Sequence, residues 1–196
     1  MKIDKIICHR NKTLLVYNGK EYEFSKDIIY KENLFEEKEI PPKEFFEIKQ
    51  KSDCLLAQNY LFRLLSTRLK SQKEAEIKLR EKGFFSSAIK FAIDKAKEYR
   101  LLDDDNYARA YVNTHLKNKG SKLIRYELVG KGISEHTIDK YLEDTWEFEK
   151  QRAMEHASKY LKAKGEKATK EKLYRRLYSK GYSNDLIMEV LSNIFE

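Results

Sequence analysis

A short motif that occurs three times constrains the fold of this chain more than any other feature. Glycine stands at positions 83, 132 and 181, so both intervals are 49 residues. Each glycine has a leucine four residues earlier, a lysine directly before it, a large apolar residue after it and an isoleucine six residues later. A second landmark, A-x-x-Y followed by an aliphatic residue, begins at Ala57, Ala108 and Ala157. Two landmarks that recur in the same order predict three tandem copies of one structural unit.

The glycine motif is typical of a helix that stops sharply. The residue after such a helix often adopts the left-handed region, where a side chain costs roughly 1–2 kcal/mol and glycine is preferred. In this kind of stop the residue after the glycine packs on the leucine. The expected pairs are Phe84 on Leu79, Ile133 on Leu128 and Tyr182 on Leu177. We expect the lysine before each glycine to face the negative end of the helix dipole.

Polar residues mark the helix starts within each unit. Ser71–Glu74 reads as a capping box, and Ser121 and Thr169 stand at matching positions. A third helix is expected after each glycine, where the possible caps are Ser86, Ser134 and Ser183. The predicted unit is therefore a long helix carrying A-x-x-Y, a short helix ending at glycine, and a third helix. Such small bundles are expected to pack end to end.

The first fifty residues follow a different pattern. Asn18-Gly19, within "TLLVYNGKEYEF", is a strong hairpin signal, and "MKIDKIICH" can supply a third strand. "SKDIIYKENL" predicts a short helix, and Pro42 suits the first turn of the next one. With 10 basic and 10 acidic residues this region is neutral, so the net charge of +8 belongs to the repeats.

These patterns together predict a mainly α fold with three tandem three-helix repeats and a small β-hairpin-containing N-terminal element. Charged residues make up 37% of the chain, above the roughly 25% usual for soluble domains, which favours an elongated, helix-rich shape. The expected divisions are 1–50, 51–102, 103–149 and 150–196.

Residue types that carry catalysis or bind metals are dispersed. Cys8 and Cys54 are isolated, and the histidines at 9, 115, 136 and 156 do not pair at ligand spacing. Asp103–Asp105 is better explained as a helix cap and first turn than as a metal site. There is no phosphate loop, nucleophile motif, signal peptide or long apolar stretch. We therefore expect a cytoplasmic protein that is not an enzyme and uses no metal or cofactor.

Basic residues are the remaining functional candidates. From Lys150 to Lys180 there are eleven Lys and Arg residues against three acids, and a second basic cluster runs from Arg63 to Lys82. A sequence pI near 9.2 favours acidic or polyanionic partners. The recurring tyrosines are Tyr60, Tyr111 and Tyr160. We expect them to pack in the core and not to stack on nucleic-acid bases.

The sequence resembles the RecX family, whose members regulate the recombinase RecA. The resemblance rests on "YLFRLLSTRLKSQKEAEIKLREKGF", "LLDDDNYARAYVNTHLKNKGSKLIRYELVGKGIS" and "EKLYRRLYSKGYS", and it covers residues 55 to 196. The neutral N-terminus is similar to that of longer members. Many members have R-P-R-S where this chain has Arg68-Leu69-Lys70-Ser71.

The resemblance implies a non-catalytic modulator, most often an inhibitor, whose three modules curve into an arc. Family members dock in the groove of the RecA–DNA filament and damp ATP hydrolysis, strand exchange and repressor cleavage. Single- and double-stranded DNA would be weaker partners, no membrane would be involved, and a monomer is expected. The candidate contact residues are Arg63, Arg68, Lys70, Arg80, Arg125, Lys131, Lys162, Lys164, Arg175 and Arg176. Asp104 and Asp105, in the family's acidic box, are either helix caps or partner contacts, and caps are favoured.

Other functions stay open on the sequence. A helical-repeat protein that binds DNA directly, without RecA, would also be basic, and it would bind free nucleic acid with a steep salt dependence. A general repeat scaffold is disfavoured because the common 33–34-residue periods do not match 49. A nuclease would need a clustered carboxylate or histidine site. The sequence does not decide between inhibition and stimulation, or between groove binding and capping of filament ends.

Overall fold

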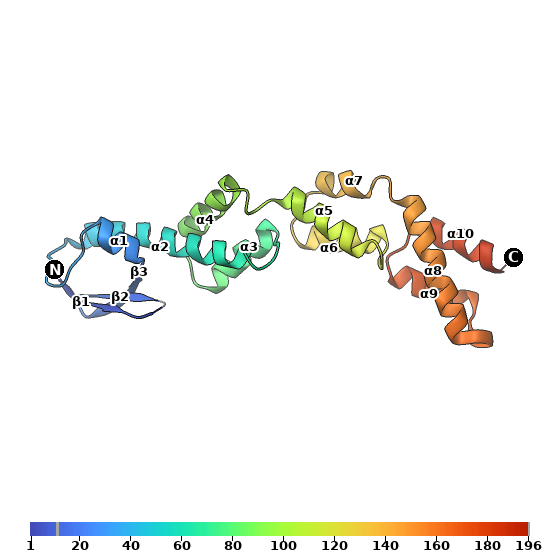
Figure 1. Ribbon diagram of the computed structural model, residues 1–196, viewed down its shortest axis with the longest axis horizontal. Coiled ribbons are helices and arrows are strands. Elements are labelled where there is room, and N and C mark those ends of the chain that lie inside the picture. The colour runs from blue at the N-terminus through green and yellow to red at the C-terminus, as the bar shows by residue number, and fades with distance from the viewer. Residues whose placement is uncertain (11, 196) are drawn as a thin grey trace. The chain divides into compact units, whose positions relative to one another are not determined.

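A computed structural model of the chain describes residues 1–10 and 12–195, and Figure 1 shows its helices and strands. The chain divides into two compact units, Met1–Leu102 and Asp103–Glu196. The first unit contains β1 (Ile3–Cys8), β2 (Thr13–Tyr17), β3 (Lys20–Phe24), α1 (Lys26–Lys31), α2 (Pro42–Leu65), α3 (Gln72–Glu81) and α4 (Ser86–Glu98). The second contains α5 (Asp104–His115), α6 (Ser121–Gly130), α7 (Glu135–Leu142), α8 (Trp146–Lys164), a 3-10 turn (Gly165–Lys167), α9 (Lys170–Ser179) and α10 (Asn184–Phe195). The mainly α class with a small β element is confirmed.

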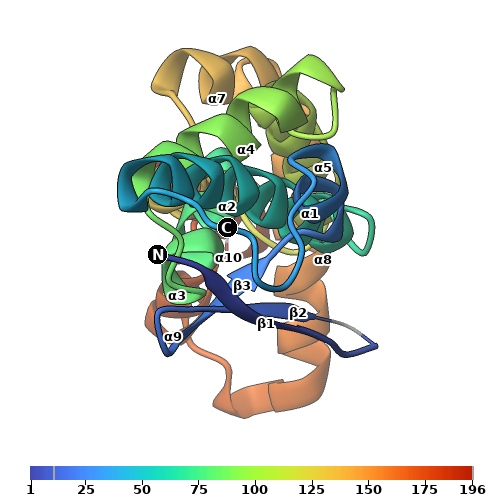
Figure 2. The same cartoon turned by 90° about the vertical axis from the view of Figure 1, so that its left-hand side faces the viewer.

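The N-terminal element is a three-stranded antiparallel sheet in the order β1-β2-β3. The predicted hairpin turn is present, since Tyr17 pairs with Lys20 and both Asn18 and Gly19 have positive φ. In Figures 1 and 2 the sheet lies on one side of α2. Phe45 of α2 is fully buried and stacks on Tyr17 with ring centroids 3.8 Å apart. The sheet is therefore held to the helix by an aromatic core.

Helix α2 links this element to the first repeat without a break. It begins at Pro42, as the sequence predicts, and continues for 24 residues. Phe45 and Ile48 belong to the core under the sheet, whereas Ala57 and Leu61 belong to the core shared with α3 and α4. One helix thus serves two cores, and residue 50 lies inside it.

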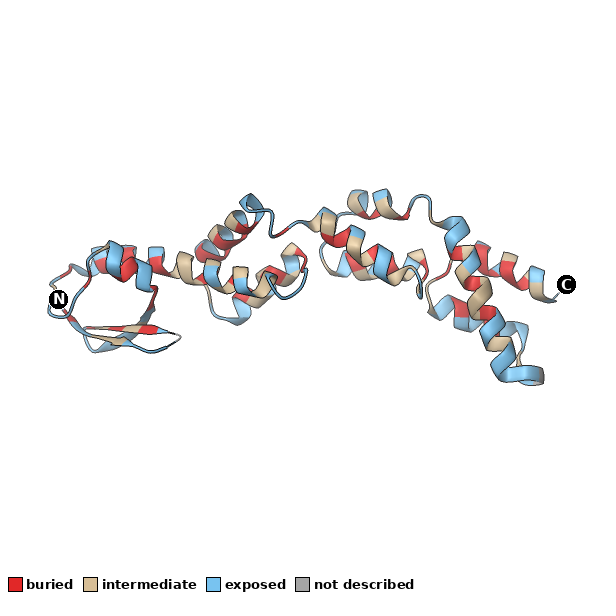
Figure 3. Ribbon diagram, viewed as in Figure 1, coloured by how far each residue is buried: buried red, intermediate tan, exposed pale blue. Residues whose placement is uncertain are grey.

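Each predicted repeat has its own hydrophobic cluster. The clusters are built by α2, α3 and α4, by α5, α6 and α7, and by α8, α9 and α10. Figure 3 shows the buried positions on the sides of the helices that face one another within these groups. The alanine of every A-x-x-Y landmark is fully buried, which allows the helices to approach closely.

The predicted helix stops are present in all three repeats. Gly83, Gly132 and Gly181 have φ of +84°, +83° and +88°. In the first stop, the Phe84 N–H donates to the Leu79 carbonyl at 3.3 Å and the Gly83 N–H donates to the Arg80 carbonyl at 2.9 Å. The same pair of bonds recurs after α6 and α9. The repeated motif is therefore a repeated chain reversal.

The predicted helix caps are correct at some positions and wrong at two. Ser71 and Glu74 form the full capping box, and Thr169 caps α9. Ser134 and Ser183 accept backbone hydrogen bonds at the starts of α7 and α10. Ser121 and Ser86 were expected to cap α6 and α4, but each is the first helical residue, and the cap positions are Gly120 and Phe85.

Gly120 stands at the cap position because the second and third repeats meet there through their backbones. Its N–H donates to the Lys180 carbonyl at 2.8 Å, and the Lys122 N–H donates to the Gly181 carbonyl at 3.1 Å. A Cβ on Gly120 would lie 2.4 Å from the Gly181 oxygen, and a Cβ on Gly181 would lie 2.2 Å from the Leu123 Cβ. Glycine is needed on both sides of this junction.

A glutamate from the third repeat replaces the missing cap of α6. The Glu149 carboxylate accepts from the Ser121 N–H at 2.8 Å and from the Thr145 hydroxyl at 2.9 Å. Glu149 is buried at the start of α8. One of the unpaired N–H groups of α6 is thus satisfied across the junction.

Alanine substitutions at Gly83 and Gly181 should destabilise the protein by different amounts, because only Gly181 lies at this junction. Gly83→Ala should lower the free energy of unfolding by roughly 1–2 kcal/mol, because an added Cβ meets no atom within 4 Å and only the backbone is strained. Gly181→Ala should cost about 1–3 kcal/mol more, because the same strain is joined by overlap with Leu123. Amide hydrogen exchange in α3 and α9 measures both losses, and equal losses would contradict the junction.

Tyr182 provides a test of the third core. It is fully buried, and among the described residues its hydroxyl has no hydrogen-bond partner. Tyr182→Phe should therefore raise the free energy of unfolding by about 1 kcal/mol. Burial, with the Glu149 charge adding to it, raises the pKa of Tyr182 to about 12.

The raised pKa also sets the expected pH dependence of this substitution. The unfolded chain releases the tyrosine proton near pH 10, before the folded chain does. The wild type should therefore lose stability between pH 10 and about 12 relative to the Tyr182→Phe variant. Urea denaturation at pH 8 and pH 11 tests this, and an unchanged difference between the two proteins would contradict it.

Candidate interaction surfaces

A basic side chain covers the landmark tyrosine in every repeat. Lys82 lies over Tyr60 with its Nζ 5.6 Å from the ring centroid. Lys131 lies over Tyr111 at 5.6 Å, and the Arg176 guanidinium lies over Tyr160 at 5.5 Å. The three tyrosines are half-buried at the edge of their clusters. The expectation that they lie in the core is therefore only partly right, because their outer faces take part in cation–π contacts.

The candidate residues of the first repeat lie in different environments. Arg63 is exposed in the last turn of α2, and Arg68 is exposed in the loop that follows. Arg80 is exposed on α3 and lies 3.8 Å from the Glu76 carboxylate. Lys70, in contrast, is only 6% exposed. Three of these four residues are available at the surface.

In the second repeat both candidates already have partners within the repeat. Arg125 donates to Asp139 of α7 at 2.5 Å. Lys131, at the end of α6, lies over the rings of Tyr107 and Tyr111. Their positive charges are therefore partly committed to holding the repeat together.

The third repeat has the most accessible basic residues. Lys162 and Lys164 are exposed at the end of α8, and Arg175 and Arg176 are exposed on α9. Arg175 also lines a shallow, mostly apolar hollow of about 290 Å³ between α9 and α10, beside Tyr174 and Met188. This face combines charge with apolar area.

The acidic box ahead of α5 has a divided role. Asp103 is the cap, because its carboxylate accepts from the Asp105 and Asn106 N–H groups. Asp104 and Asp105, which we expected to be caps, lie in the first turn. Asp105 accepts from Lys140 at 2.8 Å and from the Tyr141 hydroxyl at 2.5 Å, and these hydrogen bonds lower the pKa of its carboxyl group. The box therefore caps α5 and ties it to α7.

A second polar network joins α5 to α6. Glu127 accepts from the Tyr111 hydroxyl at 2.7 Å and from Lys119 at 2.6 Å. Burial favours a higher pKa for Glu127, but the hydrogen bonds from Lys119 and Tyr111 outweigh it and the pKa is lowered. Burial also lowers the pKa of His115. The ring centroids of His115 and Tyr111 are 4.1 Å apart. The hydrogen bonds of Glu127 thus connect α6 to Tyr111 of α5 and to the loop that follows α5.

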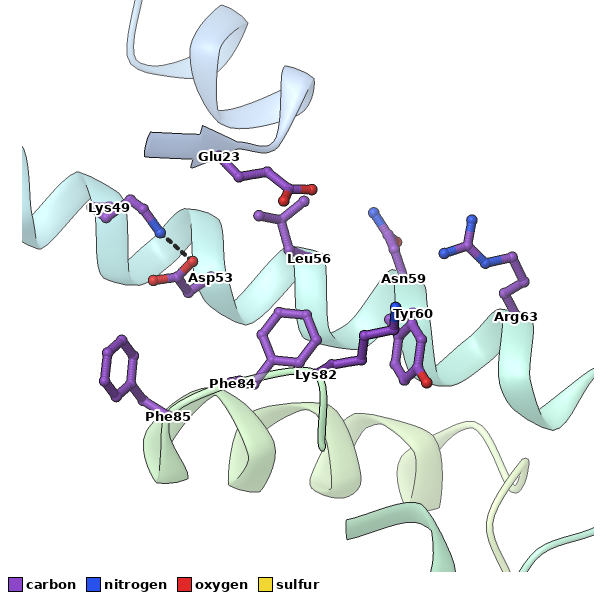
Figure 4. A pocket seen from close by; sticks show the side chains of 11 residues that line it. Glu23, Lys49, Asp53, Leu56, Asn59, Tyr60, Arg63, Lys82, Phe84 and Phe85 are labelled. Carbon is purple, nitrogen blue, oxygen red and sulfur yellow. Dashed lines mark hydrogen bonds and ion pairs between the residues drawn. The ribbon is translucent and has the colours of Figure 1, made fainter. Parts of the chain in front are cut away.

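The first unit contains a cavity that the sequence did not reveal. Its volume is about 550 Å³, and it lies between β3, α2 and the turn that joins α3 to α4. Figure 4 shows Glu23 on one side, Asn59 and Arg63 on α2, and Phe84 and Phe85 on the opposite side. Of these residues only Arg63 was predicted as a contact. The others come from three separate segments, so no local motif indicates them.

Among the residues that the structure describes, no group of three or more His, Cys, Asp or Glu side chains could hold a metal ion. None of the described helices is both long enough and apolar enough to cross a membrane.

Comparison with known proteins gives concordant matches. Residues 103–142 match the second three-helix domain of RecX, and residues 148–191 match the third. The regulatory protein RecX of Clostridium botulinum is 35% identical over 200 residues, which cover 97% of this chain and 94% of that protein.

Solved structures share the fold. A crystal structure of a regulatory protein RecX matches with a TM-score of 0.71 and 24% identity, over 96% of this chain and 98% of that chain. RecX from Lactobacillus salivarius matches with a TM-score of 0.67 and 27% identity, over 73% of this chain and 97% of that chain.

Double-mutant cycles can distinguish Arg176, which stabilises the third repeat through Tyr160, from Arg175, which makes no such contact with the described residues. Arg176→Gln and Tyr160→Leu should couple by about 0.5–1 kcal/mol in unfolding free energy, because each removes the same cation–π contact. Arg175→Gln with Tyr160→Leu is the matched control and should show no coupling. Urea denaturation of the four variants in each cycle gives the values. Equal coupling in both cycles would contradict the assignment.

Proposed function

The chain belongs to the RecX family, and from that premise we propose that it is a non-catalytic regulator of the recombinase RecA. It binds in the groove of the RecA–DNA filament and inhibits it. The observation that carries this proposal is the match to a regulatory RecX protein over 97% of the chain.

The repeated architecture supports a filament as the partner. A filament presents the same protein surface at regular intervals, and three similar modules on one chain can contact several copies of it. Each further contact is intramolecular once the first has formed, so weak individual contacts add up to a high apparent affinity.

Exposed basic residues are proposed to make these contacts. The best placed are Arg63, Arg68, Arg80, Lys162, Lys164 and Arg175. They face acidic surface of the filament or DNA phosphates. Lys70, Arg125, Lys131 and Arg176 contribute less, because Lys70 is buried and the other three are engaged within their repeats.

Occupation of the groove explains how the chain inhibits RecA without catalysing a reaction itself. A chain that bridges neighbouring subunits blocks the entry of a second duplex, which stops strand exchange. It also restrains the subunit movements that accompany ATP hydrolysis, and it covers the surface at which a repressor would be cleaved.

Titration of RecA's DNA-dependent ATPase tests the proposal. The rate should fall at ratios of this protein to RecA that are too low to cover the DNA. Fluorescence anisotropy with free labelled DNA at the same concentrations is the control. If the rate falls only when the DNA is saturated, competition for DNA explains the effect, and the chain acts as a direct DNA-binding protein.

Reversing one exposed charge should weaken this inhibition. Arg175→Glu should raise the half-inhibiting concentration about tenfold, because an attractive contact becomes a repulsive one. Lys5→Glu, an equally large charge change on an exposed residue of β1, should leave it within about twofold. Equal effects of the two variants would point to net charge instead of a defined contact.

A further inference from the structure

The cavity of the first unit is a trough along α2. The distance along α2 from Asp53 to Arg63 is ten residue steps, or about 15 Å, and Lys49 lines the cavity one turn further along. Its volume of about 550 Å³ is in the range of roughly 300–1,000 Å³ found for ligand sites. These dimensions fit an extended segment of about four amino-acid residues, at roughly 3.3–3.6 Å each.

The ionic groups of the trough are not all available. Lys49 and Asp53 form an ion pair with each other. Arg63, Lys82 and Glu23 enter no ion pair among the residues that the structure describes, although Lys82 lies over the Tyr60 ring. Figure 4 shows Arg63 toward one end of the labelled stretch of α2 and the Lys49–Asp53 pair toward the other. The available positive charge is therefore concentrated at the Arg63 end.

Apolar groups line the rest of the trough. Leu56 lies on α2 opposite Phe84, and Phe85 lies beyond it toward the Lys49–Asp53 pair. Phe85 is 74% exposed although it is a large aromatic residue at the start of α4. Together Leu56, Phe84 and Phe85 form an apolar patch with polar residues around it, which is typical of a binding groove.

This distribution of charge favours a peptide over a nucleic acid. A single strand carries a phosphate at every nucleotide, so a strand lying along the trough would place one phosphate near Asp53 or Glu23. A peptide carries charge only where its sequence places it, and can offer a carboxylate to Arg63 and Lys82 and an apolar side chain to Phe84. The wall residue Glu23 would then meet a neutral or basic group.

We propose that this trough binds an extended peptide segment of a partner protein, with an acidic residue at the Arg63–Lys82 end and an aliphatic or aromatic residue against Leu56, Phe84 and Phe85. The inference rests on the proposed function for the identity of the partner, which is the RecA protein of the filament. It assigns the first unit to protein recognition and not to DNA.

Photocrosslinking tests the site directly. Phe85→p-benzoylphenylalanine preserves an aromatic side chain at an exposed position. The full-length variant is irradiated with RecA assembled on single-stranded DNA and a non-hydrolysable ATP analogue, and the adducts are mapped by mass spectrometry. Tyr30→p-benzoylphenylalanine is the matched control, because Tyr30 is 82% exposed on α1 and outside the trough.

The expected result is an adduct between position 85 and a RecA segment that has an acidic residue within about four positions. An adduct to DNA, or equal adducts from positions 85 and 30, overturns the inference. Absence of an adduct from a variant that still inhibits the ATPase overturns it too and leaves the proposed function intact. If the wild type does not inhibit RecA at all, the proposed function fails and the inference fails with it.

Charge reversal supplies an independent measurement. Arg63→Glu should weaken binding to the filament about tenfold, and the milder Arg63→Gln should weaken it less. Lys43→Glu, an exposed residue at the other end of α2, is the control and should have no effect. Anisotropy with a labelled single strand should give the same affinity for all four proteins. A loss of DNA affinity confined to the Arg63 variants would overturn the inference.

Discussion

The left-handed glycine at the end of the second helix of each repeat is the constraint on which the rest of the structure depends. Without a Cβ the chain reverses within one residue, so the third helix returns against the first and closes a three-helix core. At Gly181 the same missing atom has a second use. It allows the backbone of Lys180–Tyr182 to lie against Gly120 and Lys122, which joins the second and third repeats by main-chain hydrogen bonds. Glu149 completes the contact by capping α6 from the next repeat.

The repeats are alike in their cores and different at their surfaces. A cation covers the landmark tyrosine in each, but it comes from the residue before the glycine in the first two repeats and from Arg176 in the third. In the third repeat Lys180 instead donates to the Asn118 carbonyl at 3.2 Å. The junction thus takes one lysine out of the repeating pattern, and an arginine one turn earlier replaces it. A basic residue of a repeat protein can therefore serve structure even where charge alone suggests a binding role.

The features predictable from the sequence were those that local chemistry decides. The glycine stops, the Ser71–Glu74 capping box and the Asn18-Gly19 hairpin each depend on a few neighbouring residues, and all are present. One error arose where a distant segment intervenes: Ser121 is not at the cap position of α6, because Gly120 stands there against Lys180 and Gly181 of the next repeat. Of the ten basic candidates, sequence could not separate the exposed Arg175 from the buried Lys70 or the paired Arg125. The sequence could not predict the trough, because β3, α2 and the α3–α4 turn meet only after folding.

The central claim is that repeated modules engage a repeated partner, and electron cryo-microscopy of RecA–DNA filaments with this protein bound tests it most directly. The account predicts density for three-helix modules within the filament groove, with successive modules of one chain in contact with different RecA subunits. It also predicts that the first unit contacts protein through the trough beside Phe85. Density confined to bare DNA or to filament ends, with no module between subunits, would contradict the account.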